Sequence, residues 1–254
     1  MDVFERFKNN QFLSPISSKT LEKIGSRCGL NDRSKVLEVD CGKGGASLVL
    51  AHLFHSQITG TENRSIFLED AKRHALFEDL THQVNFIESD VKNLPFDEKF
   101  FDLTLYLSPP IPCEINKFLA NIAPFTVIHG WIAISKIILK DNLNFNRKEN
   151  FKTWVKSFKE NDELRTLDES IKFFEELGFS VKETFLEDKK SWEDFYSSQA
   201  LTLLEKKSEN NILIQEKRSF DEWQKEVEMY HCEGGKKSLE YATFLMQKHL
   251  QISY

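Results

Sequence analysis

Three acidic residues accompany successive apolar runs in the first part of the chain. Glu38 lies within the first run, and Glu62 and Asp90 follow the second and the third. If the runs form parallel β-strands, their carboxyl ends meet at one edge of a sheet, where open α/β sheets bind ligands. Each acid could instead cap a helix or a turn on its own. Three acids in this register, next to a glycine turn, favour a ligand site.

The glycine turn has the sequence DCGKGG, residues 40–45. Gly42, Gly44 and Gly45 let the backbone approach a ligand closely, and the helix that begins there offers free amide groups. The loop is not a dinucleotide fingerprint, because Ser47 occupies the place of the third glycine, and the sequence contains no Walker A loop. An acid two positions before the turn favours a cationic ligand with hydroxyl groups, such as an adenosyl sulfonium amino acid.

The composition is that of a globular protein, with 40% hydrophobic and 29% charged residues. The net charge of -6 argues against DNA or RNA as a main partner, because phosphate binding needs a basic face. The four cysteines are far apart and form no CxxC or Cys/His cluster. We therefore expect neither a zinc site nor a disulfide framework.

The N-terminal residues lack an apolar run with a cationic start, so we expect no signal peptide. The longest apolar run, Trp131 to Leu139, contains Ser135 and Lys136 and is too short to cross a bilayer. These features predict a soluble, cytoplasmic monomer or homodimer that binds no metal, no nucleic acid and no membrane.

Apolar runs with β-branched residues alternate with helical patterns along most of the chain. Such alternation is typical of βαβ units and a parallel sheet, so the fold class is α/β. The expected strands are Val36–Val39, Gln57–Thr61, Val84–Ile87, Asp102–Leu107, Trp131–Leu139, Phe179–Leu186 and Tyr241–Gln247.

Helices are expected between these strands. Ser18 is expected to cap a first helix that Gly29 ends, Ser65 to cap another, and Gly178 to close the helix before the sixth strand. The other expected helices are Ala46–Phe54, Ile115–Ile122, Asn150–Glu160, Asp168–Leu177, Ser191–Lys206 and Ile214–Tyr230.

We expect one domain over residues 1–254. It consists of an N-terminal helical cap (1–30), a cofactor-binding core (31–140) and the remaining sheet with a helical lid (141–254). The lid, at about 188–235, is the insertion between the last two strands. Its helices are apolar, and exposed apolar surface is rarely left uncovered. We expect it to roof a closed acceptor pocket with the N-terminal helix and residues 151–158; a dimer contact is the alternative.

The sequence resembles the successive motifs of class I S-adenosylmethionine-dependent methyltransferases, especially small-molecule enzymes of the ubiquinone/menaquinone-methyltransferase type. The resemblance covers about Leu21–Leu186, and its most specific part is D-V-x-x-L-P-F followed by F-D-L. It implies a Rossmann-like seven-stranded sheet with the last strand antiparallel, helices on both faces, and S-adenosyl-L-methionine as cofactor. The matching segments are VLEVDCGKGG, ITGTENRSIFLEDAKRHA, VNFIESDVKNLPFDEKFFDLTLY, GWIAIS and FFEELGFSV.

The resemblance assigns roles along the predicted carboxyl edge. Glu38, Gly42 and Gly44 match the glycine-loop motif that lines the methionine and the ribose. Glu62 matches the acid that binds the ribose hydroxyls. The cofactor-binding residues implied in this way are Glu38, Asp40, Cys41, Gly42, Gly44, Glu62, Asn63, Asp90, Val91, Tyr106 and Leu107.

The adenine and the methyl group have their own positions in this scheme. Asp90 matches the residue that accepts from the adenine amino group, and Val91 supplies a backbone amide beside the ring. Asn63 falls where a side chain covers the adenine. Tyr106 and Leu107 lie where the chain passes the transferring methyl.

Asp40 departs from the family pattern, which has glycine at this position. Aspartate tolerates unusual backbone angles better than most residues, so we expect the turn to form. Its carboxylate could pair with the cofactor's ammonium, repel the cofactor's carboxylate or fill that group's place, and Lys43 could offset a repulsion. A non-catalytic S-adenosylmethionine-binding or regulatory protein on the same fold is therefore the rival hypothesis.

The sequence predicts the methyl acceptor less specifically than the cofactor. Ser108, Pro109 and Pro110 are similar to a loop of amino-group methyltransferases, but Ile111 replaces its aromatic residue, so a stiff turn is the alternative. A protein or nucleic-acid methyltransferase has only this loop in its favour. The candidate substrate-binding residues are Tyr106, Ser108, Trp192, Tyr196 and Tyr230, although aromatic residues at helical spacing could equally be packing.

No catalytic base is assigned from the sequence. His231 is a candidate, with a surface histidine as the simpler interpretation. Methyl transfer can rely on proximity, orientation and exclusion of water, so a missing acid–base pair does not argue against an enzyme. The predicted reaction moves a methyl group to a small-molecule O, N or C nucleophile.

Overall fold

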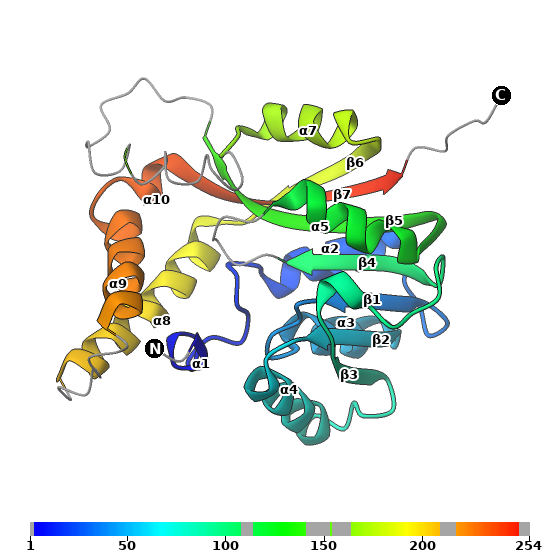
Figure 1. Ribbon diagram of the computed structural model, residues 1–254, viewed down its shortest axis with the longest axis horizontal. Coiled ribbons are helices and arrows are strands. Elements are labelled where there is room, and N and C mark those ends of the chain that lie inside the picture. The colour runs from blue at the N-terminus through cyan, green and yellow to red at the C-terminus, as the bar shows by residue number, and fades with distance from the viewer. Residues whose placement is uncertain (1–2, 108–113, 141–152, 154–163, 209–216, 249–254) are drawn as a thin grey trace.

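The computed structural model describes residues 3–107, 114–140, 153, 164–208 and 217–248 (Figure 1). A seven-stranded sheet runs through it in the order β3-β2-β1-β4-β5-β7-β6. Strand β7 is antiparallel to both of its neighbours, and the first five strands pair in parallel, as predicted. The strands are β1 (Lys35–Val39), β2 (Gln57–Glu62), β3 (Val84–Glu88), β4 (Phe101–Leu107), β5 (Thr126–Leu139), β6 (Phe179–Leu186) and β7 (Leu239–Lys248).

Helices cover both faces of the sheet (Figure 1). Alternate strand residues belong to two separate core clusters, because successive side chains of a strand point to opposite faces. Val36 of β1 packs in the first cluster and its neighbour Leu37 in the second. Helices α2 (Ser18–Cys28), α3 (Gly45–Phe54) and α4 (Ser65–Phe77) supply the first cluster, and α5 (Ile115–Ile122) and α7 (Leu167–Glu176) the second.

The observed N-terminal caps of two helices differ from the caps that the sequence predicts. Ser17, not Ser18, caps α2, and its hydroxyl accepts from the Thr20 amide at 3.2 Å. Gly29 ends that helix in the left-handed conformation, with φ 67°, as predicted. The expected cap at Ser65 is wrong, because Ser65 is already the first residue of α4. The expected helix over 150–160 lies outside the described residues.

Strand β5 begins earlier than its apolar run. Phe101 pairs with Thr126 and Leu103 with Trp131, so the residues between Thr126 and Trp131 bulge out of register. His129 adopts φ 66° within this bulge, and Gly130 follows it. The break in apolar pattern at these two residues explains why the sequence predicts a start at Trp131.

An insertion of three helices separates β6 from β7. It comprises α8 (Lys189–Ser208), α9 (Lys217–His231) and α10 (Gly235–Ser238), close to the boundaries expected for the lid. Helices α8 and α9 stand beyond the carboxyl ends of the parallel strands, beside the N-terminal helix α1 (Val3–Arg6) (Figure 1). Leu201 and Leu204 of α8 are 59% and 63% exposed, so this part of the insertion leaves apolar side chains uncovered.

A buried polar network joins α1 to the insertion. Arg6 Nη2 lies 2.6 Å from Glu226 Oε1, and Arg6 Nε donates to Gln199 Oε1 at 2.8 Å. The Trp223 indole donates to the same Gln199 oxygen at 2.9 Å, and the Tyr196 hydroxyl donates to Glu226 at 3.3 Å. The N-terminal helix is thereby fixed to α8 and α9 together.

We expect Arg6→Ala to lower the free energy of unfolding by about 2–4 kcal/mol, because it leaves the Glu226 carboxylate buried without its cation. The Arg6 and Glu226 side chains are only 13% and 11% exposed. Urea denaturation measures the loss. The control is Lys190→Ala, which breaks the solvent-exposed pair with Asp194 and should cost less than about 1 kcal/mol. Equal losses in the two variants would contradict a stabilising role for the network.

Candidate functional site

The turn between β1 and α3 bends through three left-handed residues. Asp40, Gly42 and Gly44 have φ angles of 53°, 55° and 74°. The amide of Gly44 donates to the carbonyl of Cys41 at 2.9 Å, and the amide of Cys41 donates to the carbonyl of Thr61 at 2.8 Å. The turn therefore forms with Asp40 in a conformation that glycine adopts most easily, and it is held to the end of β2.

Glu38 is a buried carboxyl group that holds the start of α3. Its Oε2 accepts from the amide and the hydroxyl of Ser47 at 2.9 and 2.5 Å. Burial raises the pKa of Glu38 to about 7, against the effect of the two hydrogen bonds from Ser47. At neutral pH this carboxyl group therefore exists in both its protonated and its ionised form. Ser47 was not among the predicted site residues.

Glu62, the last residue of β2, meets the glycine turn. Its side chain is 0% exposed, and its Oε2 accepts from the Gly42 amide at 3.0 Å. Its Oε1 accepts from the amide of Arg64 at 3.0 Å and from Arg64 Nε at 2.9 Å. The carboxylate thus lies against the turn, as the register of the strands predicts. Its pairing with Arg64 was not predicted.

Two further acids share this edge of the sheet. Burial, together with the charges of Glu62 and Asp90, raises the pKa of Asp40 to about 6 against the lowering effect of Arg64. Asp90 is exposed and accepts from the Lys92 amide at 2.8 Å, which caps the short 3-10 helix Val91–Asn93. The edge therefore gathers four carboxyl groups, those of Glu38, Asp40, Glu62 and Asp90, and the guanidinium of Arg64.

Part of this arrangement also fits the alternative interpretation, in which each acid only caps a helix or a turn. Glu38 holds the first turn of α3, and Asp90 caps a 3-10 helix. Both are structural roles that leave room for a ligand role. Asn63 is exposed beside them, Val91 is half-buried, and Cys41 is buried within the turn.

Lys43 points to a different neighbour from the one expected. Its side chain is 5% exposed, and its Nζ donates to the Lys8 carbonyl at 3.0 Å and lies 3.7 Å from Asp70 Oδ2. The cation whose charge acts on the Asp40 carboxyl is Arg64. Lys43 thus lies beside Asp70, and the expectation that it offsets a repulsion between Asp40 and the cofactor's carboxylate stays a prediction.

The N-terminal segment packs on the outside of the turn. A Cβ atom on Gly42 would lie 2.3 Å from Leu13 Cδ1, and one on Gly45 would lie 2.7 Å from the Gln11 carbonyl oxygen. Side chains larger than hydrogen are excluded at both positions unless the segment moves. The sequence contains no motif that predicts this contact, apart from an apolar pair, Phe12 and Leu13, in a polar stretch.

The candidate aromatic residues of the insertion stack on one another. Ring centroids are 5.7 Å apart for Trp192 and Tyr196, 5.5 Å for Trp192 and Tyr230, and 4.2 Å for Tyr196 and Tyr230. All three side chains are buried, and Tyr241 of β7 meets Trp192 edge-on. The packing alternative accounts for these contacts, and a role on a substrate stays a prediction.

Of the other two substrate candidates, Tyr106 lies within β4 and Ser108 directly follows it. Tyr106 is buried and stacks on Phe118 of α5 with ring centroids 3.6 Å apart. Leu107 is half-buried at the end of the strand. Ser108 lies outside the described residues. His231, the candidate base, is exposed at the end of α9, with its ring 5.0 Å from that of Tyr230.

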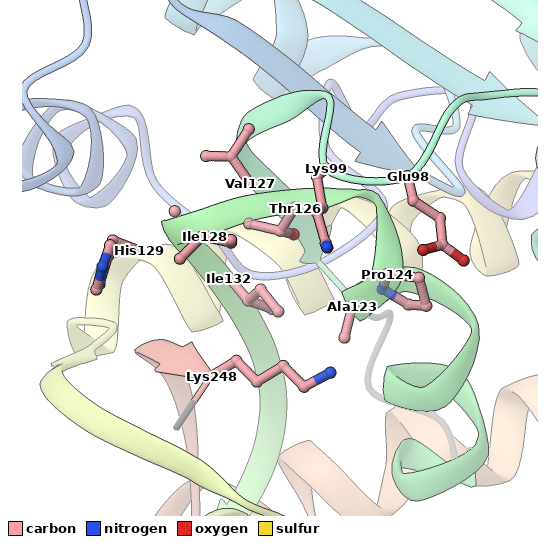
Figure 2. A pocket seen from close by; sticks show the side chains of 11 residues that line it. Glu98, Lys99, Ala123, Pro124, Thr126, Val127, Ile128, His129, Ile132 and Lys248 are labelled. Atoms are coloured by element: carbon pink, nitrogen blue, oxygen red, sulfur yellow. The ribbon is translucent and has the colours of Figure 1, made fainter. Parts of the chain in front are cut away.

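A cavity of about 410 Å³ lies at the opposite edge of the sheet. The bulge at the start of β5 forms one wall, and Lys99 and Lys248 also line it (Figure 2). Because β5 starts here, this is the amino edge of the parallel strands, away from the glycine turn. The cavity therefore plays no part in the site formed by the acids.

We expect Asp40→Asn to stabilise the protein at neutral pH. A carboxyl whose folded pKa, about 6, exceeds its ordinary value of 3.8 contributes most stability below pH about 4 and loses that contribution as the pH rises through 6. Asparagine tolerates the same positive φ. The variant should match the parent near pH 4 and exceed it by about 1–3 kcal/mol at pH 7 in urea denaturation. The exposed Asp194→Asn is the control, and a pH-independent difference would contradict the prediction.

Comparison with known proteins shows which domains and folds this chain is similar to. Residues 36–126 match a family model described as a methyltransferase domain. A sterol 24-C-methyltransferase of Gibberella zeae is 29% identical over 99 residues, which cover 39% of this chain and 26% of that protein. The matched part thus spans about a quarter of the length of this relative.

The fold is similar to that of solved structures over almost the whole chain. A methyltransferase from Thiobacillus denitrificans, in complex with S-adenosyl-L-homocysteine, has a TM-score of 0.80 at 20% identity and covers 97% of this chain and 98% of its own. One from Geobacter sulfurreducens, in complex with the same molecule, has a TM-score of 0.80 at 17% identity and covers 97% of each chain. Within the part of the chain that the structure describes, no helix is long and apolar enough to cross a membrane. Residues 36–126 are therefore similar to a methyltransferase domain, and the chain has a Rossmann-like methyltransferase fold.

Proposed function

We propose that this protein transfers a methyl group from S-adenosyl-L-methionine to a small-molecule acceptor. The observation that carries the proposal is the buried Glu62 carboxylate, hydrogen-bonded to the Gly42 amide at the carboxyl edge of the sheet. It sets a hydrogen-bond acceptor for ribose hydroxyls beside the glycine turn, on which Leu13 of the N-terminal segment also packs. The methyltransferase domain match over residues 36–126 includes both residues.

The residues at this edge fit the cofactor by charge and by hydrogen bonding. Glu62 would accept from the ribose, the backbone at Gly42 and Gly44 would line the methionine part, and Asp90 and the Val91 amide would meet the adenine. The cofactor supplies an electrophilic methyl group on a sulfonium. The chain's own task is to bind and orient both reactants and to exclude water from them.

Asp40 would contribute a negative charge near the amino-acid end of the cofactor. Burial and crowding by the charges of Glu62 and Asp90 raise the pKa of its carboxyl, and a nearby ammonium would relieve that repulsion. The same crowding is the observation that favours the rival candidate, a non-catalytic S-adenosylmethionine-binding protein. The rival predicts binding without methyl transfer.

A small acceptor is favoured by two observations. The matched relative from Gibberella zeae is a sterol 24-C-methyltransferase, whose acceptor is a small molecule. Helices α8 and α9 stand over the carboxyl edge together with the N-terminal segment, where they would roof an acceptor pocket (Figure 1). Within class I we therefore propose the small-molecule type. The exposed Leu201 and Leu204 leave a dimer contact as the alternative use of α8.

Methyl transfer is tested with the methyl-labelled cofactor and the low-molecular-mass fraction of a cell extract. The proposal expects label in a small product and formation of S-adenosyl-L-homocysteine. Label confined to macromolecules would contradict a small acceptor. Tight cofactor binding with no transfer to any fraction would favour the non-catalytic rival.

We expect Glu62→Ala to weaken binding of S-adenosyl-L-homocysteine about ten- to a hundredfold, because charge-assisted hydrogen bonds contribute about 1.5–3 kcal/mol. Isothermal titration calorimetry measures the change, and thermal melting checks that the variant is folded. The exposed Glu69→Ala on α4 is the control and should bind like the parent. No binding by the parent at millimolar ligand would remove the proposed function, whereas unchanged affinity in the variant would remove only the role of Glu62.

We expect Asp40→Gly to weaken binding of S-adenosyl-L-methionine about three- to tenfold, because it removes a negative charge near the cofactor's ammonium. Glycine adopts the φ of 53° without strain, so the change tests charge rather than turn geometry. Calorimetry with the parent, Asp40→Gly and Asp40→Asn separates the effect of the charge on binding from the effect of the turn geometry. Tighter binding in both variants would mean that Asp40 obstructs the site and would favour the non-catalytic rival.

A further inference from the structure

The Glu62 carboxylate is almost fully occupied by the protein itself. A carboxylate has two oxygens with about four lone-pair sites in all. The amides of Gly42 and Arg64 use two of these sites, and Arg64 Nε uses a third at 2.9 Å. One site is left. A ribose with two free hydroxyls needs two, so one of the present donors has to leave before both hydroxyls bind.

The backbone donors are the fixed ones. The Gly42 amide belongs to the turn that the Cys41–Thr61 hydrogen bond holds to β2. The carbonyl of Arg64 accepts from the amides of Phe67 and Leu68 at 3.1 Å each, which fixes the backbone of Arg64 as the N-cap of α4. Neither amide can turn away without breaking these hydrogen bonds.

The guanidinium of Arg64 is the donor that can leave. Its side chain is 43% exposed, whereas that of its partner Glu62 is 0% exposed. It lies over the ring of Phe67 in the first turn of α4, 4.7 Å from the ring centroid. The guanidinium can therefore turn toward water, provided that the ribose hydroxyls replace its hydrogen bond to the buried carboxylate.

We propose that Arg64 is a positioning residue that competes with the cofactor's ribose for Glu62 Oε1. This inference rests on the proposed function and deepens it. In the free protein the guanidinium neutralises the buried carboxylate amid Asp40 and Asp90. Full engagement of the ribose diol requires the guanidinium to move from Oε1 toward solvent. Arg64 therefore keeps the acidic edge stable when it is empty and lowers its affinity for the cofactor.

The ligand pair that tests this is S-adenosyl-L-homocysteine and its 2′-deoxy analogue. The analogue has one ribose hydroxyl and needs only the lone-pair site that is already free. We expect Arg64→Ala to bind S-adenosyl-L-homocysteine about three- to tenfold more tightly than the parent, while affinity for the analogue changes less than about twofold. A merely structural role would change both ligands alike.

The calorimetry is carried out at pH 8, well above the pKa of Asp40, which is about 6. Glu38, from β1, is the other carboxyl whose charge interacts with Glu62. Arg64→Gln is the second variant, for use if Arg64→Ala unfolds, and it should give the same ligand-dependent gain. The matched control is Arg218→Ala, which removes a similar Nε–Oε1 pair with Glu222, 3.2 Å apart, on the exposed face of α9.

The outcomes separate this inference from the proposed function. Equal or weaker binding of S-adenosyl-L-homocysteine by Arg64→Ala, or an equal gain for both ligands, would overturn the competition and leave the proposed function standing. Binding of neither ligand by the parent and by all variants would overturn the proposed function itself. Binding by Arg64→Ala but not by the parent would support the competition in its strongest form.

Discussion

The hydrogen bond between the Gly42 amide and Glu62 Oε2 joins the two parts of the chain on which the site depends. One part is the turn after β1, and the other is the last residue of β2. A fully buried carboxylate is tolerated only when its oxygens are hydrogen-bonded, so the turn has to present its amide at this position. The left-handed φ angles of Asp40 and Gly42 follow from that requirement.

Negative charge is the second constraint on this edge. Burial raises the pKa of Glu38 to about 7 and that of Asp40 to about 6, so ionising both in the free protein is unfavourable. Arg64 relieves part of the repulsion in the free protein, and a cationic ligand would relieve more. An edge of this kind is easier to explain as a site for a positively charged molecule than as a structural device, because apolar residues would fill the same space at lower cost.

The sheet and the meeting of the acids at one edge were predictable from the sequence, because they depend on strand periodicity and parallel register. The antiparallel last strand was expected only from the resemblance to methyltransferases. The partners of the acids were not. Arg64 is close to Glu62 in the sequence, but no sequence motif predicts the direction of the Arg64 side chain. Lys43 reaches Asp70 and the carbonyl of Lys8, and this contact depends on how distant segments pack. Likewise, the helical spacing of Trp192 and the other aromatic residues of the insertion does not predict that their rings stack on one another.

The N-terminal segment connects the glycine turn with the insertion. Leu13 packs on Gly42, and Lys43 of the turn donates to the carbonyl of Lys8. A few residues away, the Asn10 amide group donates to the carbonyl of Phe195 in α8, and the ring of Phe7 lies 6.1 Å from the ring of Phe195. A shift of this segment would therefore alter the turn and α8 at once. Since the turn lies in the proposed cofactor site and α8 in the proposed roof, the segment makes the geometry of the two interdependent.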